Sequence, residues 1–108
     1  MSVSTLEEIR DELAACNAIA STREFCESWL AKDESYLRVL KFHAADASAD
    51  ALTVCSSKLG YYAKRLAASG DPAHAQLMQK FLRLRVLCES TIERQARAKW
   101  MKPERMHG

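Results

Sequence analysis

Apolar side chains recur every three or four residues along most of the chain, which is the spacing of one face of an α-helix. The first such stripe consists of Leu6, Ile9, Leu13 and Cys16. Ser4-Thr5-Leu6-Glu7 has the form of a capping box, in which a hydroxyl and a carboxylate accept the free N–H groups of a helix start. Asn17 tolerates the left-handed conformation that ends many helices. The pattern therefore predicts a first helix from about Ser4 to Asn17.

A second capping box, Ser21-Thr22-Arg23-Glu24, precedes a short apolar stripe. That stripe consists of Phe25, Cys26, Trp29 and Leu30. It breaks at Ala31 and Lys32, and Asp33 is a good N-cap for a further helix over residues 33–42. The inward face of that helix holds Tyr36, Leu37 and Leu40. The segment therefore predicts two short helices joined by a tight turn.

Two longer helices are predicted after a connection of small residues. Ser48 is suited to cap the first, whose apolar stripe consists of Leu52, Cys55, Leu59, Tyr62 and Leu66. We expect Tyr61 to be exposed and Tyr62 to be buried, and Gly60 to weaken this helix without ending it. Ser69-Gly70 is a stop signal, and Asp71-Pro72 supplies an N-cap followed by proline at the first position of the next helix. That last helix should run to about Trp100, because Pro103 cannot continue it.

The last predicted helix has two apolar stripes instead of one. The first consists of Leu77, Phe81, Leu84, Cys88 and Ile92, and it can cover the rest of the domain. The second consists of Met78, Leu82 and Val86 on the far side. This second stripe needs another partner, either the first helix of the same chain or the same helix of a second subunit. We favour a homodimer with Met78, Leu82 and Val86 in its interface.

Length and composition agree with an all-α fold. The chain has 108 residues, of which 48% are hydrophobic and 28% charged, and its three Gly and two Pro are too few for the many turns of an all-β protein. We expect one domain over residues 1–108. Within it, residues 1–60 form a helix-turn-helix core of about four helices, residues 61–102 a helical hairpin and possible dimerisation region, and residues 103–108 a flexible tail.

The formal net charge of +2 hides a marked asymmetry along the chain. Residues 1–59 hold 10 acidic and 6 basic side chains, whereas residues 60–108 hold 10 basic and 4 acidic ones. The basic end includes Arg94, Arg97, Lys99, Lys102 and Arg105. Cations there either bind phosphates or an acidic partner, or simply complement the negative end of a helix dipole.

Motifs for catalysis or cofactor binding are missing from the sequence. It has no glycine-rich phosphate loop, no GxSxG elbow and no HExxH pair, so we expect no enzyme, no catalytic residue and no cofactor. The cysteines Cys16, Cys26, Cys55 and Cys88 form no CxxC pair, and the three histidines are scattered, so we expect reduced, buried thiols and no metal site. No stretch has the length of a membrane span or a signal peptide, which favours a cytoplasmic protein without a membrane partner.

Residues 21–60 resemble the helix-turn-helix segment of the Xre/Cro-like repressor family. Small bacterial proteins with a W-L-G-[KR]-S-E-S-Y-like motif are similar to this chain at Trp29-Leu30-Ala31-Lys32-Asp33-Glu34-Ser35-Tyr36. Three features differ from the family pattern. Ala31 occupies the position of the turn glycine, the preceding helix has one additional residue around Trp29, and Asp33 and Glu34 place negative charge next to the expected DNA surface.

The resemblance implies a transcriptional regulator, of a small bacterial or mobile-element repressor type, that binds double-stranded DNA. In such proteins the second helix of the motif lies in the major groove, here the helix over residues 33–42. Glu34 and Ser35 would then read bases, Arg38 would bind guanine and Lys41 would meet a phosphate. Thr22 and Arg23 would hold the backbone at the start of the preceding helix, and Lys32 would lie in the turn. Repression would follow from occupying an operator.

Two other interpretations remain open. Arg38 and Lys41 are also what a solvated helix face carries in any soluble bundle. The chain would then be a non-enzymatic helical interaction module, such as a mobile-element inhibitor or adaptor that binds a protein through its acidic N-terminal surface or its last helix.

Overall fold

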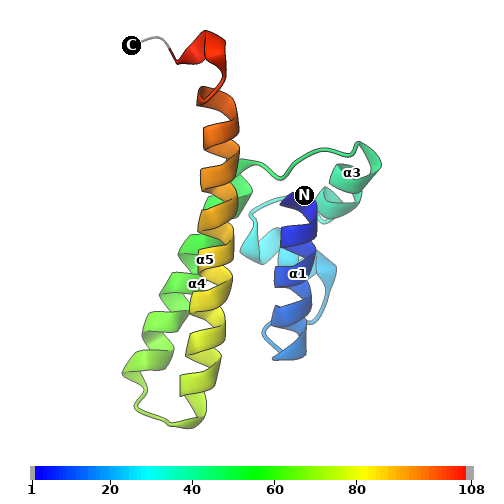
Figure 1. Ribbon diagram of the computed structural model, residues 1–108. Coiled ribbons are helices and arrows are strands. Elements are labelled where there is room, and N and C mark those ends of the chain that lie inside the picture. The colour runs from blue at the N-terminus through cyan, green and yellow to red at the C-terminus, as the bar shows by residue number, and fades with distance from the viewer. Residues whose placement is uncertain (1, 107–108) are drawn as a thin grey trace.

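The computed structural model describes residues 2–106, and all regular structure in that range is helical. In chain order the elements are α1 (Ser2–Ala15), α2 (Thr22–Glu24), the π-helical turn η1 (Phe25–Trp29), α3 (Tyr36–Phe42), α4 (Ala49–Ala68), α5 (Ala73–Trp100) and the 3-10 turn η2 (Pro103–Arg105). The long helices α4 and α5 form a hairpin, and α1 and α3 lie on one side of it (Figure 1). The predicted all-α fold with a C-terminal hairpin is confirmed.

Helix α1 begins earlier than predicted. It starts at Ser2, so Ser4 lies inside the helix and the capping box predicted there is wrong. The extra turn is favourable because Val3 packs against the core. The predicted end is confirmed: Asn17 has φ 62°, and the Ala18 N–H donates to the Leu13 carbonyl at 2.8 Å, as in a Schellman motif.

The hairpin is capped at the predicted positions. The Ser48 hydroxyl accepts the N–H of Ala51 at 3.1 Å at the start of α4, which continues through Gly60 as expected. At the start of α5, the Asp71 carboxylate accepts the N–H of Ala73 at 2.9 Å. Helix α5 reaches Trp100, and Pro103 begins the separate turn η2. The flexible tail expected over residues 103–108 therefore begins with an ordered turn, and residues 107 and 108 lie outside the described residues.

The core forms where the hairpin meets α1, η1 and α3. It is built from the predicted stripes, with Leu6, Ile9, Phe25, Leu30, Leu52, Leu59, Leu84 and the thiols of Cys26, Cys55 and Cys88 fully buried.

The hydrogen bond between the Cys55 and Cys88 thiols and their burial raise the pKa of Cys55, so it stays a neutral core thiol. Tyr62 was expected to be buried but is 38% exposed. Its ring packs on Trp29, and this contact lies at the edge of the core, so part of the ring faces solvent.

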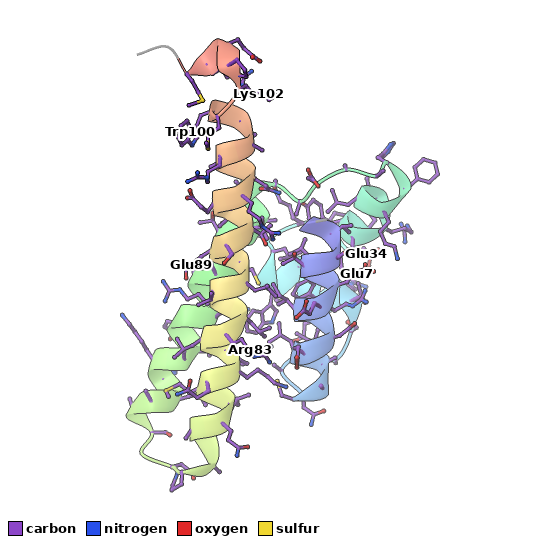
Figure 2. All side chains as sticks on the ribbon, viewed as in Figure 1. Glu7, Glu34, Arg83, Glu89, Trp100 and Lys102 are labelled. Atoms are coloured by element: carbon purple, nitrogen blue, oxygen red, sulfur yellow. The ribbon has the colours of Figure 1, made fainter. Side chains whose placement is uncertain are left out.

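Ion pairs fix α1 to the hairpin. The carboxylate of Glu12 lies 3.1 Å from the Lys80 ammonium and 3.2 Å from the Arg83 guanidinium, both on α5. Hydrogen bonds from Lys80 and then Arg83 lower the pKa of Glu12. Figure 2 shows Arg83 on the side of α5 that faces α1. Because Lys80 and Arg83 define the face of α5 that meets α1, the stripe of Leu82 and Val86 stays uncovered.

Gly60 brings α4 close to a charged side chain of α5. A Cβ atom added to Gly60 would lie 2.3 Å from Nη1 and 2.8 Å from Cζ of Arg85. These atoms are the mobile end of a long side chain, whose Nε is buried without a hydrogen-bond partner. The close approach therefore depends on the position of Arg85 and not on the two backbones.

We predict that Gly60→Ala stabilises the protein. Alanine gains about 1 kcal/mol over glycine inside a helix, and Arg85 needs only to swing towards solvent. Chemical denaturation of Gly60→Ala, Arg85→Ala and the double variant measures the effect and its coupling. If Gly60→Ala lowers the free energy of unfolding with Arg85 present and also without it, the backbones themselves are in conflict and the interpretation is wrong.

Candidate nucleic-acid interface

The segment over residues 21–42 begins with the predicted capping box. The Ser21 hydroxyl accepts the N–H of Glu24 at 3.1 Å. The Glu24 carboxylate accepts a backbone N–H in return at 2.6 Å, from Ala20 and not from Ser21 itself. Thr22 is exposed as the first residue of α2. The cap fixes the direction in which the chain enters the buried part of the segment.

The chain then widens into the π-helical turn η1. A π-helical turn holds one more residue than an α-helical turn, which accommodates the additional residue noted around Trp29. The turn ends with Ala31 at φ 54°, the left-handed position where the family pattern has glycine. The N–H of Lys32 closes it by donating to the carbonyl of Cys26 at 2.9 Å. Trp29 and Leu30 are both buried as a result.

Helix α3 is shorter than predicted. The expected helix over residues 33–42 has regular helical structure only from Tyr36, because the Asp33 carboxylate accepts the Ser35 N–H at 2.9 Å and its hydroxyl as well, forming a local turn. The Ser35 hydroxyl, then the Ser35 N–H, lower the pKa of Asp33, and the charge of Arg38 adds to this effect. Asp33 thus organises the start of α3 as an ionised cap.

Tyr36 ties α3 to α4, a role that its apolar spacing did not indicate. Its hydroxyl accepts the N–H of Ser48 at 2.9 Å and donates to the Ser48 hydroxyl at 3.3 Å. The connection between the two helices begins with Ala44 at φ 49°, where the Ala45 N–H donates to the Leu40 carbonyl at 2.9 Å. The start of α3 is therefore held in place relative to α4, and its end is closed by a local hydrogen bond.

Three of the four cations predicted to contact DNA have acidic partners within the chain. Arg23 lies 3.3 Å from Glu34 and 3.4 Å from Glu27. Lys41 lies 3.1 Å from Glu7, on the side of α1 that faces α3 (Figure 2). Lys32 lies 3.1 Å from Asp50 of α4 and above the ring of Tyr36. The structure thus brings Arg23 and Glu34 together, but directs Lys41 towards α1 and Lys32 towards α4.

The outward face of α3 holds Arg38 and an aromatic residue that the sequence interpretation missed. Arg38 is exposed and has no ion-pair partner among residues 2–106, although its charge acts on Asp33. Phe42, one helical turn later, is 83% exposed. Its place outside the inward stripe of Leu37 and Leu40 was the available signal. The exposed face of α3 is therefore mixed in character, with one unneutralised cation.

The residues proposed for a dimer interface lie on α5, away from α1. Met78 is half-buried and packs against the core, whereas Leu82 is 38% and Val86 60% exposed. The first helix of the same chain leaves Leu82 and Val86 open to solvent. A partner for this stripe would have to come from outside the chain.

Residues 2–106 contain neither a cluster of metal ligands nor a membrane-spanning helix. That range has no group of three or more His, Cys, Asp or Glu side chains placed to hold a metal ion. None of the helices described there combines the length and apolar character needed to cross a membrane.

Fold and site together define an all-α protein in which two short helices and a turn are mounted on a long helical hairpin. The chain belongs to the family described as "Family of unknown function (DUF6626)", whose model matches residues 6–101. No curated protein and no solved structure matches it.

We predict that Ala31→Gly stabilises the turn before α3. The left-handed conformation costs an L-residue about 1 kcal/mol, and glycine adopts it without strain. Thermal unfolding should show a higher Tm for this variant. The matched control is Ala96→Gly at an exposed position inside α5, which should lower the Tm because glycine weakens a helix. A decrease in both variants would contradict the assignment of strain to Ala31.

Proposed function

We propose that the protein is a DNA-binding transcriptional regulator that places α3 in the major groove. The observation that carries this proposal is the outward face of α3, where the exposed Arg38 has no ion-pair partner among the described residues. A capped helix, a tight turn and the Tyr36 anchor hold this face rigidly. The order of these elements is that of the repressor family which residues 21–60 resemble.

The ion pairs around α3 are compatible with phosphate binding. Exposed pairs such as Arg23 with Glu34 contribute at most about 1 kcal/mol, so a DNA phosphate can replace the carboxylate. Glu34, once released, is suited to accept a hydrogen bond from the amino group of cytosine, and Arg38 to donate two to guanine. Phe42 is suited to contact a thymine methyl group. Acidic residues at this surface would then favour binding to sites with particular bases over binding to DNA of any sequence.

A homodimer through the stripe of Leu82 and Val86 fits this proposal. One subunit offers few unpaired cations near α3, and a second subunit doubles the contacts on an operator with two half-sites. The expected operator is an inverted repeat with half-sites about 34 to 36 Å apart.

The alternative is a helical module that binds another protein. It is favoured by the acidic partners of Arg23, Lys32 and Lys41, which neutralise much of the expected DNA surface. In that case the exposed Phe42 would be a contact for the partner protein.

We predict that Arg38→Ala weakens binding to a duplex selected from a random pool by about 1 to 3 kcal/mol and relaxes the preference at one base position. Lys41→Ala should weaken binding to all duplexes alike and reduce the log-log salt slope by about 0.9. Fluorescence anisotropy titrations at several salt concentrations measure both quantities. Lys64→Ala, which removes an exposed cation of α4, is the control and should change little. If the protein binds neither a selected duplex nor any genomic fragment at about 50 mM salt, the DNA-binding proposal is wrong and the protein-binding alternative is favoured.

We predict that the protein has twice the mass of its 12.2 kDa chain in solution and that Val86→Glu makes it monomeric. A charge buried in an apolar interface costs several kcal/mol, enough to separate the subunits. Light scattering with size-exclusion chromatography measures the mass. Ala67→Glu adds the same charge at an exposed position of α4 and should leave the dimer intact. If the wild type is a monomer, or if neither Leu82→Glu nor Val86→Glu affects the dimer, the proposed interface is wrong.

A further inference from the structure

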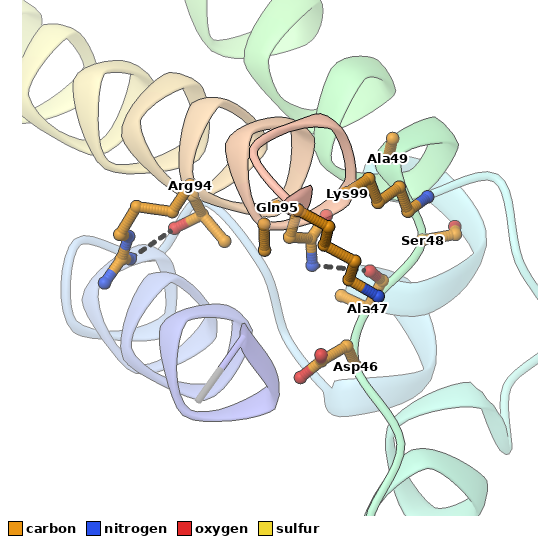
Figure 3. A pocket seen from close by; sticks show the side chains of 10 residues that line it. Asp46, Ala47, Ser48, Ala49, Arg94, Gln95 and Lys99 are labelled. Atoms are coloured by element: carbon orange, nitrogen blue, oxygen red, sulfur yellow. Dashed lines mark hydrogen bonds between the residues drawn. The ribbon is translucent and has the colours of Figure 1, made fainter. Parts of the chain in front are cut away.

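A groove of about 630 Å³ lies between the last turns of α5 and the connection that leads from α3 to α4. Its walls include Ala47 and Ser48 on one side and Arg94, Gln95, Lys99 and Lys102 on the other. Figure 3 shows Lys99 extending across the groove towards Ser48 and Ala49, with Asp46 on the part of the connection further from Lys99. The groove is open to solvent, and its cations come from the end of α5 and from Lys102 just after it.

Two cations of this groove differ from Arg23, Lys32 and Lys41, each of which has an acidic partner. Lys99 and Lys102 have no ion-pair partner among residues 2–106, and Arg94 donates to the Thr91 hydroxyl at 3.1 Å. Residues 94–106 contain five basic side chains and one acidic side chain. Arg97 in this stretch pairs with Glu93 at 3.9 Å, whereas Lys99 and Lys102 at the groove have no such partner among the described residues, so the groove carries unpaired positive charge.

Hydrogen bonds hold the groove in shape. The Gln95 side chain donates to the carbonyl of Ala47 at 2.9 Å and so joins α5 to the connection (Figure 3). The Arg105 guanidinium donates to the Lys99 carbonyl at 3.1 Å and so folds η2 back on the end of α5. Arg105 adds a further cation beside Lys99. A preformed arrangement of this kind lowers the entropic cost of binding an anion.

The groove lies close to α3 in the fold. The connection over residues 43–48 joins them, and six residues span at most about 20 Å. Figure 1 shows α3 and the last turns of α5 on either side of this connection, in the same half of the molecule. We therefore expect a duplex that receives α3 in its major groove to bring its backbone close to Lys99 and Lys102.

We propose that this groove binds a phosphate of the DNA backbone next to the site of α3. The inference rests on the proposed function and names a second contact surface for the same ligand. Lys99 and Lys102 supply the charge, and contacts of this kind position the protein without reading bases. The carboxylate of Asp46 limits the anion to the part of the groove near Lys99.

The test compares the double variant Lys99→Gln/Lys102→Gln with the wild type on the selected duplex. Each lost phosphate contact should reduce the log-log salt slope by about 0.9, so we expect a reduction of about 1 to 2 and no change in base preference. Lys64→Gln is the matched control. Lys64 is an exposed cation of α4 about 20 Å from the start of that helix, and its loss should leave the slope unchanged.

A second measurement separates this inference from the proposed function. Titration with inorganic pyrophosphate, followed by NMR, should shift the amide signals of Ser48, Gln95 and Lys99 in the wild type and not in the double variant. Such shifts without any DNA binding would mean that the groove binds phosphoryl groups although the proposed function is wrong. DNA binding with an unchanged slope in the double variant, or no shift with pyrophosphate and no DNA binding, would overturn the inference.

Discussion

The contact of Trp29 with the hairpin is the constraint on which the rest of the structure depends. The indole packs 5.8 Å from the ring of Tyr62 and 6.1 Å from that of Phe81, which lie on the two different helices of the hairpin. Lys58 lies above the same indole at 4.7 Å and donates to the carbonyl of Ser28 at 2.7 Å. Burying Trp29 here requires the widened turn η1 and then the left-handed Ala31, which redirect the chain into α3. The position of α3 is therefore a consequence of how one aromatic side chain is buried.

Charge is organised on a different principle in the two halves of the chain. In the N-terminal half, which has an excess of acidic residues, cations and carboxylates from separate elements meet, as in the pair of Lys41 with Glu7, so that ion pairs join the elements. At the end of α5 and just after it, Lys99 and Lys102 have no acidic partners among the described residues. Paired charges attract a polyanion only weakly, so binding there would depend on specific contacts. The unpaired Lys99 and Lys102 would attract any polyanion. A near-neutral total thus coexists with one strongly positive region.

Structural features with a local cause could be predicted from the sequence, whereas features that depend on tertiary contacts could not. The caps at Ser21 and Ser48 and the end of α1 at Asn17 follow from side chains that bond to their own backbone neighbourhood. The cap at Ser4 failed because packing of Val3 extends α1, a gain that no local signal reveals. In the candidate site, the exposed positions of Arg38 and Glu34 were expected. The ion pair between Glu34 and Arg23 was not, because Arg23 meets Glu34 only after the turn has brought α2 next to α3.

In the proposed DNA complex, simultaneous contacts from separate elements would decide the affinity. Arg38 lies on α3, and the cations of the groove lie outside that helix. Their contributions to DNA binding would add only if one duplex reached both. The hydrogen bond from Gln95 to Ala47 keeps these elements in register, since it joins the end of α5 to the connection that follows α3. A second subunit attached through Val86 would multiply this effect, because linked sites bind with a high effective concentration. In the proposed complex, weak charge near α3 would limit binding to single non-specific sites, while a matched pair of half-sites would still bind a dimer.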